Sequence, residues 1–378
     1  MAKSQTVLQR KDTTSKSALY ISFDLGDKSW QISLGDDRFH VSRHTVAAGD
    51  TSAVATHILK AAARFKISGR SEVYSVYEAG RDGWWFHRWL CELRVDNIVV
   101  DPSSIEVNRR ARQAKTDRLE ADKLLAMLIQ HHAGERVWSV LREPSRDDED
   151  ARREHRELQR LAHERIAHTN RIGSLLVLHN LRPGIVIGGR DWAKWWTAHR
   201  DKVPTLLRAE LERECKRLRL VKDQVRAIEG AHRLELAEGK QPLVDQLVRL
   251  RAIGPKGAWI LVKEVFGWRQ FSNRRELASS LGLVPTPHAS GSIEREQGIS
   301  KAGNRRVRAL LVEQAWSWLR LQPDSDLTHW FNRRFAASGA RMRRVGIVAL
   351  ARRLAVALWR YLQDGEIPAG AHLKSTAA

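Results

Sequence analysis

Four carboxylic acids in the first third of the chain stand where their side chains could meet at one edge of a sheet. Asp24 and Glu78 each lie at the end of an apolar segment that has the pattern of a β-strand. Asp117 and Glu120 lie at the start of a helical segment, and their spacing places both side chains on one face. Such a cluster repels itself unless a cation neutralises it, and its hard oxygen ligands favour Mg²⁺ or Mn²⁺. Two such ions could stabilise the attacking and leaving oxygens of a phosphodiester displacement.

The same acids also have an ordinary structural interpretation. Acidic residues are common in the turns that follow strands, and Asp117-Arg118-Leu119-Glu120 fits a helix capping box. Spacing alone leaves the two interpretations open. Asp122 competes with Glu120 as the fourth acid, but it points to nearly the opposite side of the helix, so geometry favours Glu120.

A serine in the last third of the chain could act as a nucleophile. Ser290 lies in segment 282–292, which contains two prolines and is predicted to be a loop, and Gly291 beside it leaves the hydroxyl exposed. Most surface loops share these features, and His288, two positions away, gives no evident Ser-His-Asp triad. The hydroxyl would then be activated by a metal or by nearby arginines.

The charge of the chain indicates a polyanionic partner. The 378 residues include 65 lysines and arginines against 44 aspartates and glutamates, a formal net charge of +21 that is spread along the chain. Nucleic acid is the commonest partner of such a surface. The Gly-Pro turn in segment 250–258 resembles a helix-hairpin-helix, whose amides can hold a phosphate. A solvated helix face is the alternative for each basic cluster. The candidates for nucleic-acid contacts are Arg109, Arg110, Lys115, Lys256, Lys301, Asn304, Arg305 and Arg306.

Other composition features exclude several classes of protein. The two cysteines, Cys91 and Cys215, form no CxxC pair, so neither a disulfide framework nor a zinc site is expected. The N-terminus is polar up to Ser17, and we find no signal peptide and no apolar stretch long enough to span a membrane. A reducing cytoplasm is the expected compartment.

The order of the expected elements indicates a multidomain chain, α/β followed by mostly α. Strands expected at 18–24, 30–34 and 38–41 would form an antiparallel meander, and strands at 73–77 and 97–100 would join through helical crossovers. This is the strand pattern of the ribonuclease-H-like fold.

Changes in composition predict the domain boundaries. Residues 1–17 are polar and expected to be flexible, and residues 18–144 form the α/β domain. Residues 145–240 contain two long charged helices with narrow apolar stripes, typical of an antiparallel coiled coil that serves as a spacer or dimerisation module. Residues 241–378 are expected to be compact, helical and to carry the serine.

An ordered set of short motifs resembles the one-ten family of insertion-sequence transposases, in its eleven-eleven subgroup. The strongest matches are the stretches 115–121 and 298–304. The motifs, in chain order, are Phe23-Asp24-Leu25-Gly26, Tyr77-Glu78-Ala79-Gly80-Arg81-Asp82-Gly83, Val107-Asn108-Arg109-Arg110, Lys115-Thr116-Asp117-Arg118-Leu119-Glu120-Ala121, Gly282-Leu283-Val284-Pro285, Ser290-Gly291 and Gly298-Ile299-Ser300-Lys301-Ala302-Gly303-Asn304.

The resemblance implies a RuvC-like DEDD domain that holds Mg²⁺ and a C-terminal transposase domain with the nucleophile at Ser290. The metal ligands implied are Asp24, Glu78, Asp117 and the acid at Glu120. The serine would form a covalent phosphoserine linkage to DNA before strand exchange. The family pattern usually has aspartate at the position of Glu120, whose extra methylene moves the carboxylate outward and makes Asp122 the alternative ligand.

The resemblance also implies partners. Family members are expected to work as homo-oligomers, dimers that pair into tetramers, with the carboxylates of one subunit and the serine of another in one active site. An element-encoded guide RNA would be bound in addition to DNA. The alternative function is a RuvC-type nuclease that cuts DNA junctions with metal-activated water and has no role for Ser290.

Overall fold

The computed structural model describes residues 18–36, 41–65, 73–105, 117–290 and 293–374. At 103, 117–119, 287–290 and 293–297 it describes the backbone alone. The flexible segment predicted at 1–17 lies outside the described residues. The chain forms two compact units, Met1–Glu143 and Pro144–Ala378.

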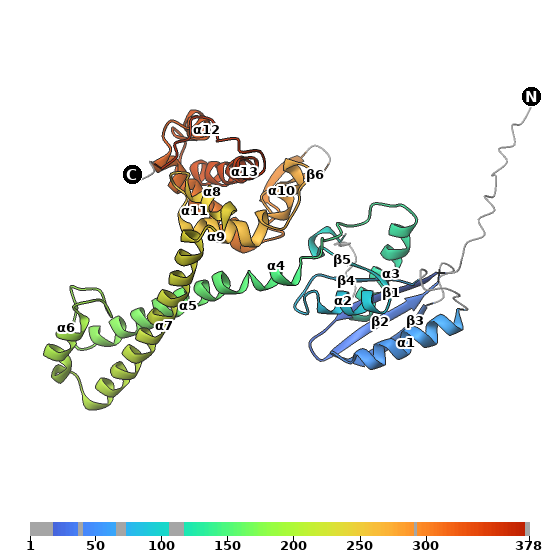
Figure 1. The fold of residues 1–378 in the computed structure, drawn as a ribbon, viewed down its shortest axis with the longest axis horizontal. Coiled ribbons are helices and arrows are strands. Elements are labelled where there is room, and N and C mark those ends of the chain that lie inside the picture. Colours follow the sequence, from blue (N-terminus) through green and yellow to red (C-terminus); the bar gives the residue numbers. More distant parts are fainter. Residues whose placement is uncertain (1–17, 37–40, 66–72, 106–116, 291–292, 375–378) are drawn as a thin grey trace, which may run out of the picture. The chain divides into compact units, whose positions relative to one another are not determined.

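The first unit is built on a five-stranded mixed sheet with the strand order β3-β2-β1-β4-β5. Strands β1, β2 and β3 are antiparallel, whereas β4 pairs in parallel with both β1 and β5. The meander and the parallel crossovers that the sequence predicts are therefore both present (Figure 1). The elements of this unit are β1 (Leu19–Leu25), β2 (Ser29–Gly35), β3 (Val41–Ala47), α1 (Thr51–Arg64), β4 (Val73–Glu78), α2 (Trp85–Glu92), β5 (Asp96–Val100), a short 3-10 turn (Pro102–Ser104) and α3 (Asp117–His132).

Of the strand predicted at 38–41, residues 38–40 lie outside the described residues, and the described strand extends well beyond residue 41. The strand is Val41–Ala47, and it pairs with β2 along its whole length, from Gly35↔Val41 to Ser29↔Ala47. Because β3 is half-exposed and its apolar alternation is weak, local composition gives little signal for this strand, and its pairing with β2 identifies it.

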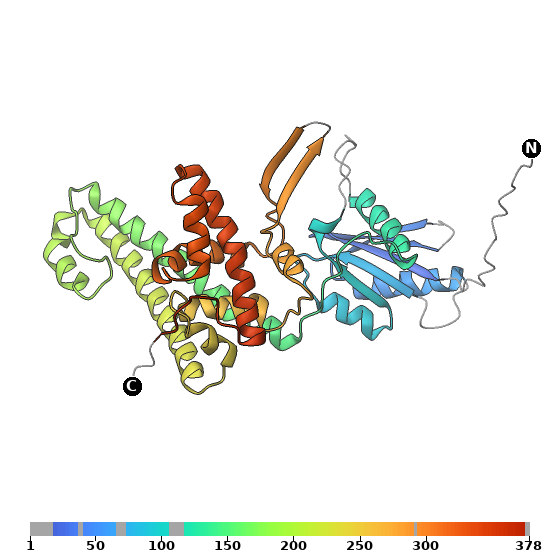
Figure 2. The ribbon, with the colours of Figure 1, turned by 90° about the horizontal axis from the view of Figure 1, so that it is seen from above.

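Helices cover both faces of the sheet (Figure 2), and an apolar core lies on each face. On one face, Ile58 of α1 and Phe86 of α2 pack with Phe23 of β1. On the other face, Leu124 and Leu128 of α3 pack with other strand residues. Because helices cover both faces at the centre of the sheet, the parallel strands β1, β4 and β5 contain short apolar runs, as parallel strands of α/β units do.

The second unit begins with an antiparallel helix hairpin made by α5 and α7. Polar contacts fix its direction, because early residues of α5 meet late residues of α7: Glu154 Oε2 lies 2.9 Å from His232 Nε2, and His168 Nδ1 lies 2.6 Å from Glu214 Oε1. The elements are α4 (Arg146–Asp150), α5 (Arg153–Val177), α6 (Trp192–His199), a 3-10 turn (Arg200–Lys202) and α7 (Thr205–Ala237).

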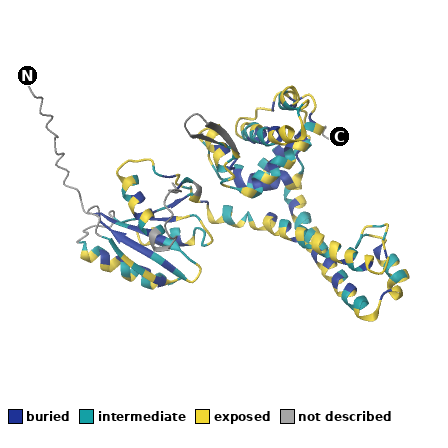
Figure 3. Ribbon diagram, turned by 180° about the vertical axis from the view of Figure 1, so that it is seen from behind, coloured by how far each residue is buried: buried dark blue, intermediate teal, exposed yellow. Residues whose placement is uncertain are grey.

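The apolar stripes predicted for these helices face each other within one chain. Leu161, Ile172 and Leu176 of α5 and Leu211 and Leu218 of α7 are buried. The outer faces of the hairpin are exposed (Figure 3). An interface with a second molecule would therefore use a different surface from these stripes.

The rest of the second unit is a helical body with one β-hairpin. Trp259, Trp318, Phe331 and Leu350 lie in its core. The elements are α8 (Pro242–Val248), α9 (Pro255–Leu261), a π-helical turn (Val262–Phe266), α10 (Arg274–Ser280), β6 (Pro285–Ser290), β7 (Ile293–Ile299), α11 (Arg305–Leu321), α12 (Asp326–Phe335) and α13 (Ala340–Asp364). No helix among the described residues is long and apolar enough to cross a membrane.

Segment 282–292 is largely strand, not the loop that its prolines and glycines predict. Residues Pro285–Ser290 form β6 and pair with β7 in a two-stranded sheet, which stands out from the helices (orange in Figure 2). Both strands of such a ribbon are edges, so a proline costs no bond to a second neighbour, and the register shift lies between Pro285 and Pro287.

Two glycines hold the base of this hairpin together. A Cβ on Gly282 would lie 1.9 Å from the carbonyl oxygen of Ala302, and a Cβ on Gly303 would lie 2.0 Å from that of Ser280. Both glycines have positive φ angles, +64° and +75°. The close approach permits the hydrogen bonds from Lys301 N to Gly282 O and from Asn304 N to Ser280 O. The motifs that contain Gly282 and Gly303 are thus explained by the close packing of the chain just before β6 against the chain just after β7.

Candidate active site

Asp24 and Glu78 lie side by side on neighbouring parallel strands. In the β1–β4 pairing Phe23 is opposite Tyr77, so Asp24 and Glu78 occupy the next position on each strand. Phe23 and Tyr77 are buried in the core with α1 and α2. Because successive side chains alternate between faces, Asp24 and Glu78 belong to the other face, the one that α3 covers.

Helix α3 runs antiparallel to β1, with its first turn toward Asp24. The hydroxyl of Ser22, which is fully buried, donates a hydrogen bond of 2.6 Å to the carbonyl oxygen of Ala121. At the opposite end of the helix, the ring of His132 lies 5.6 Å from that of Tyr20. The helix therefore begins at the end of β1 that carries Asp24. The topology brings Asp24, Glu78 and the first turn of α3, with Asp117 and Glu120, to one end and one face of the sheet.

The side chain of Asp122 binds residues of β2 and β3. Its carboxylate accepts hydrogen bonds of 2.7 Å from Ser33 Oγ and 2.9 Å from Arg43 Nε. These contacts hold α3 over β2 and β3, and Arg43 balances the charge of the Asp122 carboxylate. Asp122 therefore anchors the helix, and the choice of Glu120 as the fourth metal ligand stays a prediction.

The donor chemistry at this end of the sheet suits a hard cation. Asp24, Glu78 and Glu120 offer only carboxylate oxygens, the ligands that Mg²⁺ prefers. Each of the three also makes a contact within the protein. Among the described residues no group of three or more His, Cys, Asp or Glu side chains is gathered closely enough to hold a metal ion. This statement does not cover Asp117, because the structure does not describe its side chain.

Ser290 is the last residue of β6 and pairs with Ile293 of β7. It belongs to the second unit, whereas the carboxylates belong to the first. At the tip of a two-stranded ribbon the backbone of a residue is held by few neighbours, which suits a group that must reach a large substrate.

The predicted basic contacts fall into three groups. Arg109, Arg110 and Lys115 lie outside the described residues. Lys256, at the start of α9, and Lys301 and Arg305, before and at the start of α11, are exposed. Asn304 and Arg306 instead bind other side chains of the protein.

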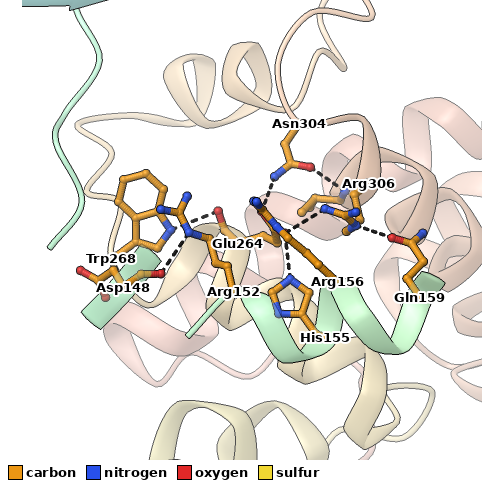
Figure 4. Close-up of polar contacts among 10 residues, drawn as sticks. Asp148, Arg152, His155, Arg156, Gln159, Glu264, Trp268, Asn304 and Arg306 are labelled. Carbon is orange, nitrogen blue, oxygen red and sulfur yellow. Dashed lines mark hydrogen bonds and ion pairs between the residues drawn. The ribbon is translucent and has the colours of Figure 1, made fainter. Parts of the chain in front are cut away.

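Asn304 and Arg306 bind a buried glutamate that the sequence analysis missed (Figure 4). Glu264, in the π-helical turn, is 2% exposed and accepts hydrogen bonds of 2.8 Å from His155 Nε2 and Arg156 Nε. Arg156 Nη2 and Asn304 Nδ2 bind its other oxygen, at 2.9 and 3.0 Å, and Arg306 Nη1 lies 3.3 Å away. Asn304 also caps α11 by accepting from Val307 N.

This network joins the helix hairpin to the helical body. Burial alone would raise the pKa of Glu264, but the hydrogen bonds from His155 and Arg156 outweigh it and hold that pKa well below its usual range. Glu264 is therefore ionised and paired. The sequence offered one sign of this site, since Glu264 lies within the largely apolar segment 258–266. A charged residue in such a segment is expected to be buried and to have partners.

Replacing Glu264 with glutamine is expected to lower the free energy of unfolding by about 3 kcal/mol, because Arg156, Arg306 and His155 lose their buried counter-charge. The value lies at the low end for buried pairs, since Arg156 and Arg306 are partly exposed and can be hydrated. Glu157→Gln, which removes an exposed partner of Arg160, is the matched control and should change less than about 0.5 kcal/mol. Urea unfolding at neutral pH measures both; equal, small effects would contradict the assignment.

The same variant gives a pH dependence of known sign. Because the pKa of Glu264 is lower in the folded than in the unfolded protein, its contribution to stability is present above the ordinary glutamate value of about 4.3. That contribution declines as the pH falls toward the folded value. Glu264→Gln should therefore lose less stability on acidification than the wild type does.

The comparisons with known proteins identify the family. A profile described as "Transposase IS116/IS110/IS902 family" matches residues 244–329. The chain is also 37% identical over 383 aligned residues to "Putative transposase y4rJ" of Sinorhizobium fredii, and the match covers 95% of each protein. The chain belongs to the IS116/IS110/IS902 transposase family.

Two further relatives of this transposase come from named insertion sequences. One is the transposase for insertion sequence element IS1111A of Coxiella burnetii, 47% identical over 51 residues, or 14% of each chain. The other is the transposase for insertion sequence element IS1328 of Yersinia enterocolitica, 28% identical over 147 residues, covering 38% of this chain and 42% of the relative. The family predicted from the sequence motifs is confirmed. The residues that the profile matches include β6, β7 and Gly303, which packs closely against Ser280.

Proposed function

We propose that this transposase cuts and rejoins DNA by serine chemistry. The oxygen of Ser290 attacks a backbone phosphorus, an O–P bond forms, and the bond from phosphorus to the departing sugar oxygen breaks. The sugar hydroxyl leaves with a proton, and the DNA stays covalently bound to the serine. The hydroxyl of the new partner strand then attacks the same phosphorus and releases Ser290 with its proton.

The carboxylate cluster has the second role in the proposal. Asp24, Glu78, Asp117 and Glu120 would hold Mg²⁺, or Mn²⁺, in a RuvC-like domain over residues 18–144. The bound ion would supply charge stabilisation at the phosphate. The observation that carries this proposal is the convergence of Asp24, Glu78 and the start of α3 at one end of one face of the sheet. The order β3-β2-β1-β4-β5, three antiparallel strands followed by two parallel ones, supports the RuvC-like assignment.

The proposed assembly is a homo-oligomer in which the carboxylates of one subunit act with the serine of another. Residues 145–240 would connect the subunits and residues 241–378 would form the serine-bearing domain. Three large apolar side chains near the far end of the helix hairpin support an interface there, because Leu178, Val186 and Leu206 are between 75% and 85% exposed. The net charge of +21 supports binding both DNA and an element-encoded guide RNA.

A covalent protein–DNA adduct tests the proposed chemistry. The protein is incubated with element-end DNA, guide RNA and Mg²⁺, and the products are separated on a denaturing gel. We expect a slowly migrating adduct, and peptide mapping should place the nucleotide on Ser290. Cleaved DNA without any adduct would instead favour a RuvC-type nuclease that uses metal-activated water.

A further inference from the structure

A groove of about 1040 Å³ lies beside the β-hairpin in the second unit. Residues of α10, α12 and α13 line it together with the base of β6–β7. Its apolar surface includes Trp330 of α12 and Val345, Val348 and Val356 of α13. The lining residues of α13 recur every three or four positions, so they form one face of that helix.

Six basic side chains line the same groove, and none of the acidic side chains that the structure describes does. The structure shows no ion pair between any of the six and a carboxylate whose side chain it describes. Arg353 lies over the ring of Trp330, 4.1 Å from its centroid. Burial, followed by repulsion from Arg334 and Arg274, lowers the pKa of Arg353. The six are Arg274, Arg275, Lys301, Arg352, Arg353 and Arg360.

We propose that this groove binds a single strand of DNA next to the point of cleavage. Basic side chains at a groove follow the phosphates of a strand, and apolar and aromatic surfaces pack against its unpaired bases. A duplex keeps its bases stacked inside and would leave the apolar surface uncovered. Binding a polyanion also relieves the repulsion among the clustered cations.

The position of the groove favours DNA, rather than RNA, as the bound single strand. Pro285 and Ile299, which pair at the base of the hairpin, line the groove, and Ser290 ends the same strand as Pro285. Five residues of strand span roughly 17 Å, the length of about five stacked nucleotides. A strand joined to Ser290 could therefore continue into the groove. The choice of DNA over RNA rests on the proposed function of Ser290.

Strand binding is measured by fluorescence anisotropy with labelled oligo(dT), at several salt concentrations, in EDTA and in the Ser290→Ala background. These conditions need neither metal nor nucleophile, so the groove is tested even if the proposed chemistry is wrong. The variant is Arg352→Ala/Arg360→Ala, and neither residue has a hydrogen bond or ion pair with the described part of the protein. Arg213→Ala/Arg320→Ala removes the same charge from exposed positions outside the groove.

We expect the slope of log affinity against log salt to fall by about 1.4 for the groove variant, since each phosphate contact to a single strand contributes about 0.7. The control pair should change the slope by much less. Val345→Glu should also weaken strand binding, whereas Met342→Glu, at a similarly exposed position of α13 outside the groove, should not.

Two results would overturn the proposal. One is an unchanged slope, or a change equal to that of the control pair. The other is a larger loss for oligo(rU), or for duplex DNA, than for oligo(dT), because the groove would then serve RNA or a duplex.

Discussion

Ser290→Ala is expected to abolish strand transfer and the covalent adduct while leaving binding of element-end DNA near the wild-type level. Without the hydroxyl no O–P bond can form, and removing a nucleophile that acts with other groups typically costs about 10⁴-fold or more in rate. The side chain is small and lies at the end of a two-stranded ribbon, so the change should leave the fold intact. Rates of joined-product formation measure the effect.

Ser300→Ala is the matched control for this prediction. Ser300 follows β7, is exposed, and ties the hairpin base through its backbone N–H, which alanine retains. It should recombine DNA at close to the wild-type rate. Joined product from Ser290→Ala at more than a few per cent of that rate would rule out the serine mechanism, because no covalent linkage could then be required.

Asp24→Asn is expected to lower the rate of strand cleavage by about 10³-fold or more. Asparagine keeps the size of the side chain but removes the charge that would hold Mg²⁺, and a bound metal contributes several kcal/mol at the reacting phosphate. Asp24 lies outside the apolar cores but makes a contact within the protein, so urea unfolding of the variant is measured beside its cleavage rate. Cleavage of element-end DNA, titrated with Mg²⁺ and then Mn²⁺, measures the loss.

Asp122→Asn tests whether Asp122 is a metal ligand or a residue that anchors α3. Its carboxylate is bound to Arg43 and Ser33, so the variant should lose about 1 kcal/mol of stability and retain most cleavage at saturating Mg²⁺. Glu120→Asp should cleave at least as fast as the wild type. Asp122→Asn as inactive as Asp24→Asn at every metal concentration would reverse the assignment of the fourth acid.

The sequence by itself determined the features that depend on near neighbours in the chain. Strands that carry Asp24 and Glu78 at or next to their ends follow from alternation and turn chemistry, and a helix was expected where α3 places Asp117 and Glu120 in its first turn. The net charge and the ordered motifs sufficed to identify the family of transposases. Alternation failed where a strand is half-exposed, as in β3, and where prolines mark an edge ribbon rather than a loop, as in β6; β7, the partner of β6, was not predicted either.

Only the tertiary structure decided which side chains meet. Asp122 and Arg43 lie far apart in the sequence, as do Glu264 and Arg156, and no local pattern pairs them. The assignment of Asp122 as an anchor, the use of Asn304 and Arg306 in a buried network and the alignment of basic side chains along one groove all depend on contacts between distant elements. The physical reason is that burial and pairing fix the role of a charged residue, and both are properties of the packed chain rather than of its neighbours in sequence.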